Sequence, residues 1–455
     1  MYGLIRNLVF GMFVSFFVFD VDAQTLADSA WRVTMDTSRF GPVETVLQFH
    51  EHDGKLIAES LSGALEIIQP LPNANSNTVD VSKALFSFSL KETGGKYEGE
   101  VLSPWKEGTI VLEKTDAGFS GRIDNTFFFS GSINVVAIEP PDHPLRDYEA
   151  IAKTLFTVTK NKVFNPADLK KEAFLKFKQT FDAIASSAHD DLDFLIGFHL
   201  AWMNDPFSHY DLKRSEMGAA DMMAFFDTFE IGQQAAYVKY EDDIAVLTVD
   251  TMMGLDTIRY INQAFDDIAE KQPKALIIDL RNNGGGAFAV KPLVEHIIDE
   301  PLDAGYFMSN QWNQKNGRLP NKNEVAALTP WKGWSILAFW KDVQEQGLMK
   351  IRFEPAQPNY DGPVYVLTSK RTASAAEMAL DALRSSGKVT IIGETSSGEM
   401  LSQSMYDVQD GFMLSLPIAD YISIKNGRIE GVGVPVDVEV EAGQALEKAK
   451  EVIGN

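Results

Sequence analysis

The sequence predicts an α/β domain preceded by an all-β domain, with a helical segment between them. Residues 24–139 carry short strand patterns and little helical periodicity. Residues 148–202 have the apolar spacing of packed helices. Farther along the chain, buried-strand patterns lead into helical ones, most clearly on either side of Ser374.

Ser374 lies where a strand leads into a helix. Residues 362–368 are typical of a buried strand, and residues 375–383 have helical composition and spacing. A helix N-terminus offers unpaired N–H groups and partial positive charge, which stabilise an oxyanion. A nucleophilic serine fits this position, and so does a serine that only caps the helix.

A second motif is the run at residues 274–286, an apolar strand that ends in three consecutive glycines. Glycines without side chains can point backbone N–H groups at an anion. The order of residues typical of a phosphate-binding loop is absent, so nucleotide binding is not predicted. A plain turn is the alternative for the glycines alone.

Two further polar segments complete the pattern. A helical pattern breaks at Asp205 and Pro206, which places Ser208 and His209 in a loop. Glu399 follows the strand at residues 389–392. A histidine in this setting can serve as a general base, although a single histidine is more often an ordinary polar or core residue.

These four pieces, in this order, resemble the tricorn-like and carboxyl-terminal-processing serine peptidases. The resemblance covers residues 145–450 and includes the glycine-rich stretch at 430–437. It implies a catalytic domain of the crotonase-like or ClpP-like α/β type and hydrolysis of a peptide or protein substrate. The GxSxG turn of α/β-hydrolases is absent, which disfavours the commonest competing class of serine hydrolase.

The resemblance also implies roles for particular residues. Where one branch of the family has the lysine of a Ser-Lys dyad, this chain has Glu399. The tricorn-like branch has a Ser-His-Ser-Glu tetrad, which Ser374, His209, Ser208 and Glu399 match in that order. The oxyanion donors would be the N–H groups of Gly285 and Ala375.

Glu394 lies in the same loop as Glu399 and is the competing candidate for the carboxylate. Neither a metal nor a cofactor is required. About 35 residues separate His209 from the next predicted strand at 243–249, so the peptide-binding PDZ module of the dyad branch is missing.

The first residues are typical of a secretory leader. A basic start and a short apolar core precede a small-x-small cleavage site, which predicts a signal peptide at residues 1–23 and an exported, periplasmic or secreted protein without a stable membrane anchor. The chain has no cysteine, so disulfides are excluded. Its net charge of −23 disfavours nucleic acid as a partner. The oligomeric state is not predicted.

The first domain, residues 24–140, is predicted to be an antiparallel barrel or sandwich, with lipocalin-like topology as one candidate. Asp53 and Gly54 predict a hairpin turn. His50 and His52 would share one strand face and form half of a metal site, but no third ligand occurs at useful spacing. No metal site is therefore predicted.

The remaining boundaries are a helical segment at 141–235, in which Asn165 is expected to cap a helix, and the α/β domain at 236–455. An insertion at 310–357 carries four tryptophans and is expected to form a lid over the site or a packed helical hairpin. Two other functions remain open: an inactive peptide-binding protein on the same fold, and acyl-thioester chemistry. The predicted export disfavours the latter because coenzyme A chemistry is cytosolic.

Overall fold

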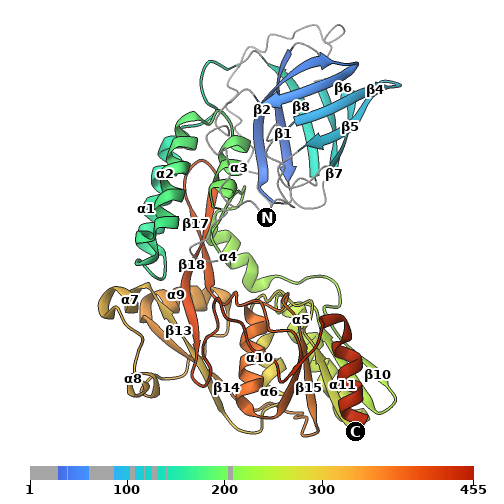
Figure 1. The fold of residues 1–455 in the computed structure, drawn as a ribbon, viewed down its shortest axis with the longest axis vertical. Coiled ribbons are helices and arrows are strands. Elements are labelled where there is room, and N and C mark those ends of the chain that lie inside the picture. Colours follow the sequence, from blue (N-terminus) through green and yellow to red (C-terminus); the bar gives the residue numbers. More distant parts are fainter. Residues whose placement is uncertain are drawn as a thin grey trace, which may run out of the picture. The chain divides into compact units, whose positions relative to one another are not determined.

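The computed structural model describes residues 29–37, 39–60, 87–102, 108–116, 118–124, 131–138, 141–202 and 209–454. The chain forms two compact units (Figure 1). The first comprises the residues described up to Leu145 together with Ser187–Asp193, and the second comprises Arg146–Ser186 and Phe194–Asn455. The predicted leader at 1–23 and Ser208 lie outside the described residues.

The first unit contains a closed antiparallel barrel, which decides between the barrel and the sandwich. Its strands are β1 Ser29–Thr37, β2 Gly41–His52, β3 Lys55–Ser60, β4 Ser87–Thr93, β5 Lys96–Leu102, β6 Gly108–Thr115, β7 Gly118–Asp124 and β8 Gly131–Ile138. Each strand pairs with the next, and β1 also pairs with β8, which closes the barrel. The predicted turn at Asp53 and Gly54 joins β2 to β3, and both residues have positive φ.

The barrel interior is filled by alternate side chains of its strands. Trp31, Phe49 and Phe88 are almost fully buried, as the two-residue period of a strand requires. The segment Ser187–Asp193 joins this unit through Asp190, whose carboxylate accepts hydrogen bonds from Thr45 Oγ1 (2.5 Å) and the Val46 N–H (3.1 Å).

The helical segment supplies α1 Tyr148–Lys162, α2 Glu172–Ser187 and α3 Asp191–Ala201. Phe156, Phe177 and Phe181 pack between these helices. Asn165 was predicted to cap a helix, but the N-cap of the helix that follows it is Ala167. The carbonyl and side chain of Asn165 accept N–H groups of a turn that leads into the 3₁₀ helix Asp168–Lys170, and α2 begins only at Glu172.

The rest of the second unit is built on two sheets. The first contains β10 Ala236–Glu241, β11 Ile244–Val249, β12 Ala275–Asp279, β15 Val364–Thr368, β16 Val389–Gly393 and β20 Val438–Glu439, in that order. All neighbours pair in parallel except β10 and β11. The second contains β14 Leu348–Phe353, β13 Leu302–Ser309, β18 Phe412–Ser423 and β17 Ser402–Asp407, with β9 Asp211–Arg214 and β19 Gly427–Arg428 paired to β18.

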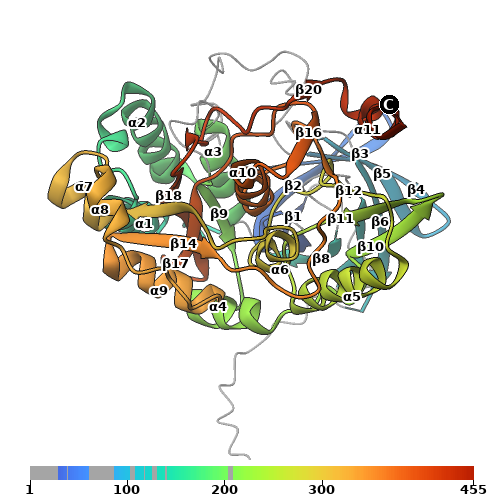
Figure 2. The same ribbon diagram turned by 90° about the horizontal axis from the view of Figure 1, so that it is seen from below.

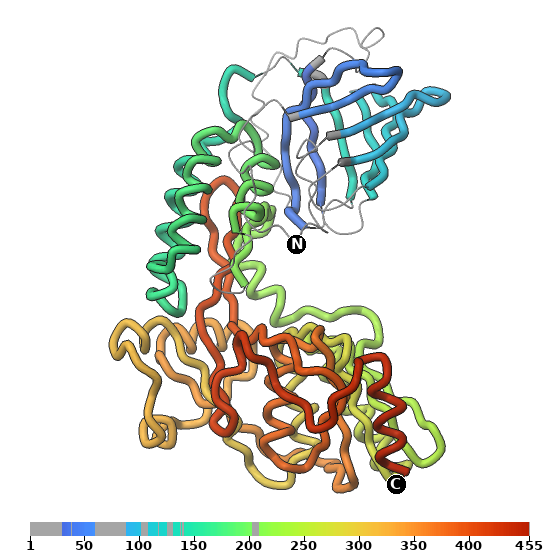
Figure 3. Tube along the Cα trace, in the orientation of Figure 1, coloured from blue at the N-terminus to red at the C-terminus, as the bar shows by residue number. Residues whose placement is uncertain are grey.

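Helices cover both faces of the first sheet (Figure 2). They are α5 Leu255–Lys271, α6 Val290–Glu295 and α10 Ala375–Ser386 on one face, and α11 Ala445–Gly454 on the other. Leu276 and Ile278 of β12 join the core under α5, α6 and α10, whereas Ile277 packs toward α11. The chain trace shows β17 and β18 running alongside α1 (Figure 3), where Phe412 meets Tyr148.

The remaining helices are α4 Ala219–Thr228, α7 Asn310–Asn316, α8 Lys322–Ala326 and α9 Ile336–Gln346. The insertion expected at 310–357 thus contains three helices and β14. Among the described residues, no helix combines the length and the hydrophobicity needed to cross a membrane. The predicted order of an all-β domain, a helical segment and an α/β domain is confirmed.

Candidate functional site around Ser374 and His209

The glycine loop and the Ser374 turn lie together because β12 and β15 are parallel neighbours. Ile278 pairs with Val366 and Asp279 with Leu367, so both strands end at the same edge of the sheet. β12 leads into the three glycines, and β15 leads to Ser374. In α/β sheets this carboxyl edge is where functional loops gather.

Ser374 directly precedes α10 and has a strained backbone. Its φ is 55°, which is costly for a residue other than glycine, and conformations of this kind cluster at functional sites. The N–H of Ala375 is the first of the helix, where an N–H has no partner within the helix. It also has no acceptor among the described residues. This N–H is therefore available to an anion beside Ser374.

Asn283 holds the glycine loop against the serine turn. It is fully buried, and its backbone carbonyl accepts the Ala373 N–H at 3.1 Å. Its side chain donates to the Val249 carbonyl (2.9 Å) and accepts the Gly285 N–H (2.9 Å). The backbone carbonyl of Asn283 therefore links the glycine loop to the serine turn, and its side chain holds the glycine loop to the end of β11.

Gly285 is in close contact with the serine turn. A Cβ at this position would lie 2.7 Å from both the Ser374 Cβ and the Ala373 carbonyl oxygen, and its φ is +95°, so only glycine fits. Its N–H is donated to Asn283, and it would have to leave that acceptor to serve an oxyanion. The neighbouring Gly284 and Gly286 line the cavity described below.

Glu377 is a buried carboxylate that the sequence analysis missed as a site residue. It accepts the Ser374 N–H (3.0 Å), the Ser396 hydroxyl (2.6 Å), and the N–H groups of Gly398 (2.7 Å) and Glu399 (2.9 Å). Burial raises its pKa, and these donors oppose that shift. Glu377 thus ties the backbone of Ser374 to the loop that carries Glu399.

His209 precedes β9, a strand that the sequence did not predict. β9 exists because it pairs with β18, with Asp211 opposite Ser415. Tyr210 and Leu212 are buried, whereas His209, Asp211 and Lys213 alternate with them and line a cavity. The φ of His209 is 61°, so it shares positive φ with Ser374.

Two carboxylates act on the imidazole of His209. Burial lowers the pKa of His209, and the charges of Glu430 and Glu399 raise it, Glu430 more strongly. Glu430 was missed by the sequence analysis, although it begins the stretch 430–437 on which the resemblance partly depends. Its carboxylate accepts the N–H groups of Met400 (2.6 Å) and Leu401 (3.0 Å).

Glu394, the competing candidate for the carboxylate, does not line the cavity of His209. Glu394 lies 3.6 Å from Lys370 Nζ and lines a different pocket, together with Arg281. Glu399 is exposed, and its backbone N–H is held by Glu377. The predicted partner of both His209 and Glu399, Ser208, lies outside the described residues.

Ser374 and His209 line one cavity of about 380 Å³. Most of its wall is apolar, from the side chains of Phe226, Met253, Phe288, Phe307, Trp334, Ile336, Phe339, Trp340, Ile351, Met378, Met400, Leu401 and Met405. Trp334, Ile336, Phe339 and Trp340 belong to the insertion at 310–357. The insertion is therefore a packed helical element, and it also forms part of the cavity wall. A cavity of this size fits one or two side chains of a peptide.

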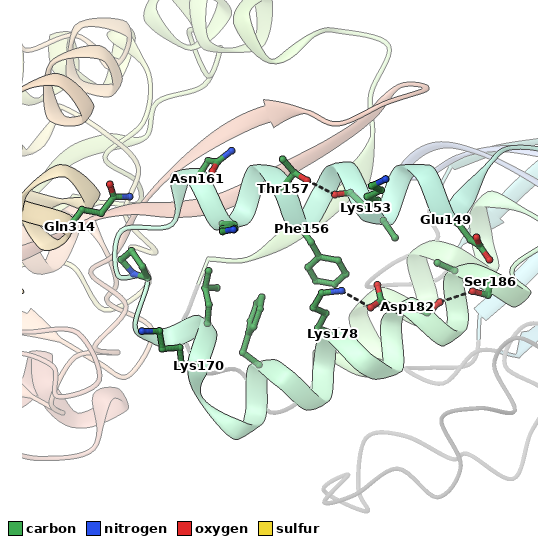
Figure 4. A pocket seen from close by; sticks show the side chains of 16 residues that line it. Glu149, Lys153, Phe156, Thr157, Asn161, Lys170, Lys178, Asp182, Ser186 and Gln314 are labelled. Atoms are coloured by element: carbon green, nitrogen blue, oxygen red, sulfur yellow. Dashed lines mark hydrogen bonds and ion pairs between the residues drawn. The ribbon is translucent and has the colours of Figure 1, made fainter.

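A larger cavity of about 1060 Å³ lies elsewhere, between α1 and α2 (Figure 4). Figure 4 shows Phe156 of α1 pointing toward Lys178 of α2, which pairs with Asp182. Neither Ser374 nor His209 lines it. No group of three or more His, Cys, Asp or Glu side chains suited to a metal ion occurs among the described residues.

Comparison with known proteins finds similar peptidases. The family model of peptidase family S41 matches residues 243–440. The carboxyl-terminal-processing protease of Synechocystis sp. is 23% identical over 51% of this chain and 44% of its own length. The carboxy-terminal processing protease CtpA of Bacillus subtilis is 24% identical over 51% of this chain and 42% of its own.

The chloroplastic carboxyl-terminal-processing peptidase 2 of Arabidopsis thaliana is 35% identical over 34% of this chain and 29% of its own length. The chain thus matches less than half the length of each of these curated relatives. The matched region of this chain contains the glycine loop, Ser374, Glu399 and Glu430, whereas His209 precedes it. The similarity to peptidase family S41 therefore rests on residues 243–440.

Proposed function

We propose that this chain is a serine peptidase that hydrolyses peptide bonds through an acyl-enzyme on Ser374. The observation that carries the proposal is the single cavity in which Ser374, at the N-terminus of α10, and His209 both take part. Similarity to carboxyl-terminal-processing proteases supports a peptide or protein as the substrate. No cofactor takes part in the proposed reaction.

In the proposed mechanism, His209 removes the proton of the Ser374 hydroxyl as its Oγ attacks the substrate carbonyl. The tetrahedral oxyanion then faces the Ala375 N–H and one N–H of the glycine loop. Gly285 remains our candidate in that loop, provided its N–H turns away from Asn283, and Gly284 and Gly286 are its neighbours in the cavity wall. Protonated His209 donates to the leaving amine, and water then hydrolyses the acyl-enzyme.

The proposed relay behind His209 consists of Ser208 and a carboxylate. We retain Glu399 as predicted and add Glu430, because the charges of both raise the pKa of His209. A negative charge there stabilises the imidazolium that forms during the reaction. Glu394 is left out, since it faces Lys370.

Peptide turnover tests this proposal. The purified chain is incubated with a mixture of peptides of varied sequence, and the products are identified by mass spectrometry. The proposal predicts internal cleavage products that Ser374→Ala does not form. Equal product formation by both proteins would contradict it.

The pH dependence of kcat/KM reports on His209. Burial lowers its pKa below the ordinary imidazole value of about 6.5, so it is neutral and able to accept a proton at pH 7. Activity is therefore expected to fall only on the acid side of that value, as the imidazole becomes protonated. Lys370→Met and Lys388→Met should keep this profile, since neither lysine is assigned a role. An acid limb above pH 7 would contradict His209 as the base.

Three matched Glu→Gln variants test the carboxylate. Glu430→Gln and Glu399→Gln each remove a charge that raises the pKa of His209, so each should lower kcat/KM and move the acid limb to lower pH. The loss should be greater for Glu430→Gln, between about tenfold and about 10⁴-fold, as for other orienting carboxylates. Glu394→Gln is the control and should resemble the wild type. An acid limb that stays fixed in both variants would remove these carboxylates from the relay.

We also propose that the chain is exported, on the strength of the leader pattern at residues 1–23. Expression with the native leader in bacteria, followed by fractionation and mass spectrometry, should give a mature chain that starts at Gln24. A cytosolic chain that keeps Met1 would contradict export.

A further inference from the structure

Lys213 brings a positive charge to the Ser374 cavity. It lies on β9, two positions beyond Asp211 and four beyond His209, and the alternation of the strand directs all three to the cavity wall. Its neighbour across the sheet is Met413, which packs with Met405 in a small apolar cluster. The lysine therefore stands at the end of the cavity nearest to that cluster.

The ammonium group of Lys213 forms no ion pair or hydrogen bond with the described residues. Asp211, the carboxylate on the same face of β9, lies 3.4 Å from His199 Nε2. Lys213 is only half-buried, so water solvates its ammonium group while the cavity is empty.

The role of Lys213 differs from that of the proposed relay. The charges that act on the pKa of His209 are those of Glu430 and Glu399, and Lys213 is not among them. The nearby wall, from Phe226, Trp340 and Met405, is apolar. A peptide that fills the cavity would displace water from the ammonium group, and a buried ammonium requires an anion in exchange.

We propose that Lys213 binds a carboxylate of the peptide substrate, and so selects peptides that carry one close to the scissile bond. The carboxylate is either the C-terminal group or the side chain of Asp or Glu. The net charge of −23 repels anionic peptides in general, so a local cation is required to hold one in the cavity. This inference rests on the proposed peptidase function and extends it to substrate choice.

The test uses three related peptides. The first has a free C-terminal carboxylate, the second has the same sequence with a C-terminal amide, and the third is the amide with glutamate as its last residue. Turnover is measured with the wild type, and binding by fluorescence anisotropy with Ser374→Ala, so that recognition is read even without catalysis. The wild type should favour one of the carboxylate peptides over the plain amide by about tenfold, as expected for one charge-assisted hydrogen bond. Which of the two is favoured identifies the source of the carboxylate.

Lys213→Met and Lys213→Gln should bring the ratio of carboxylate to amide peptide, in turnover and in binding, close to one. For the binding measurement, each is combined with Ser374→Ala. Lys213→Arg should keep most of the wild-type ratio. Lys370→Met, at an exposed lysine, is the matched control and should keep the wild-type ratio. Two charge-removing variants are used so that poor folding of one does not decide the result. A ratio that is unchanged in both, or a wild type that does not discriminate in turnover or binding, would overturn the inference.

The outcomes also separate this inference from the proposed peptidase function. Discrimination in binding without any turnover would support the role of Lys213 and contradict the peptidase. Turnover without discrimination between the peptides would support the peptidase and contradict the role of Lys213.

Discussion

Ser374→Ala is expected to abolish peptide hydrolysis, with a loss on the order of 10⁶-fold in kcat, as found where nucleophile and base act as one unit. Alanine keeps the small size of the residue at this half-buried turn, so the stability of the fold should change little. His209→Ala should cause a similar loss, and the double variant should be little worse than either. These values are measured as initial rates, with thermal unfolding as a check of folding.

Additive losses in the double variant would show that Ser374 and His209 do not act together. Near-wild-type turnover of either single variant would remove that residue from the mechanism.

Replacing Glu377 should have the second largest effect. Glu377→Ala leaves three N–H groups and one hydroxyl without the acceptor that the fully buried Glu377 side chain provides. Each buried unsatisfied group costs about 1–3 kcal/mol, so the free energy of unfolding should fall by about 3 kcal/mol or more. The measurement is urea unfolding of the full chain.

The matched control for Glu377→Ala is Glu399→Gln, a change to an exposed carboxylate in the tethered loop, which should alter stability by no more than about 0.5 kcal/mol. Glu377→Gln keeps the size of the side chain but replaces one acceptor oxygen with a donor. Because Glu377 holds the N–H of the strained Ser374, this variant should also lower kcat more than it changes KM. Unchanged unfolding and unchanged kcat would contradict the tether.

Local signals in the sequence were sufficient to predict the strand and the helix on either side of Ser374. The strand before it and the helix after it were predicted at residues 362–368 and 375–383 and occur as β15 and α10. Apolar β-branched runs and alanine-rich helical spacing are properties of neighbouring residues, so they are visible without tertiary information. The same holds for β12 and the turn at Asp53 and Gly54.

Features that depend on contacts between residues far apart in the sequence could not be predicted from local patterns. β9 is four residues long and mostly polar, and it becomes a strand only through β18, about 200 residues later. The tether by Glu377 and the influence of Glu430 on His209 likewise arise from folding. The direction of the Gly285 N–H is set by Asn283, which no spacing argument reveals.

Covalent labelling with a fluorophosphonate tests the central claim most directly, because only an activated serine reacts at an appreciable rate. Wild type, Ser374→Ala and His209→Ala are treated with the probe at pH 7, and the modified peptide is located by mass spectrometry. The account predicts labelling of the wild type at Ser374, none at this position in Ser374→Ala, and strongly slowed labelling in His209→Ala. A folded wild-type protein that is not labelled, or is labelled at another serine, would contradict it.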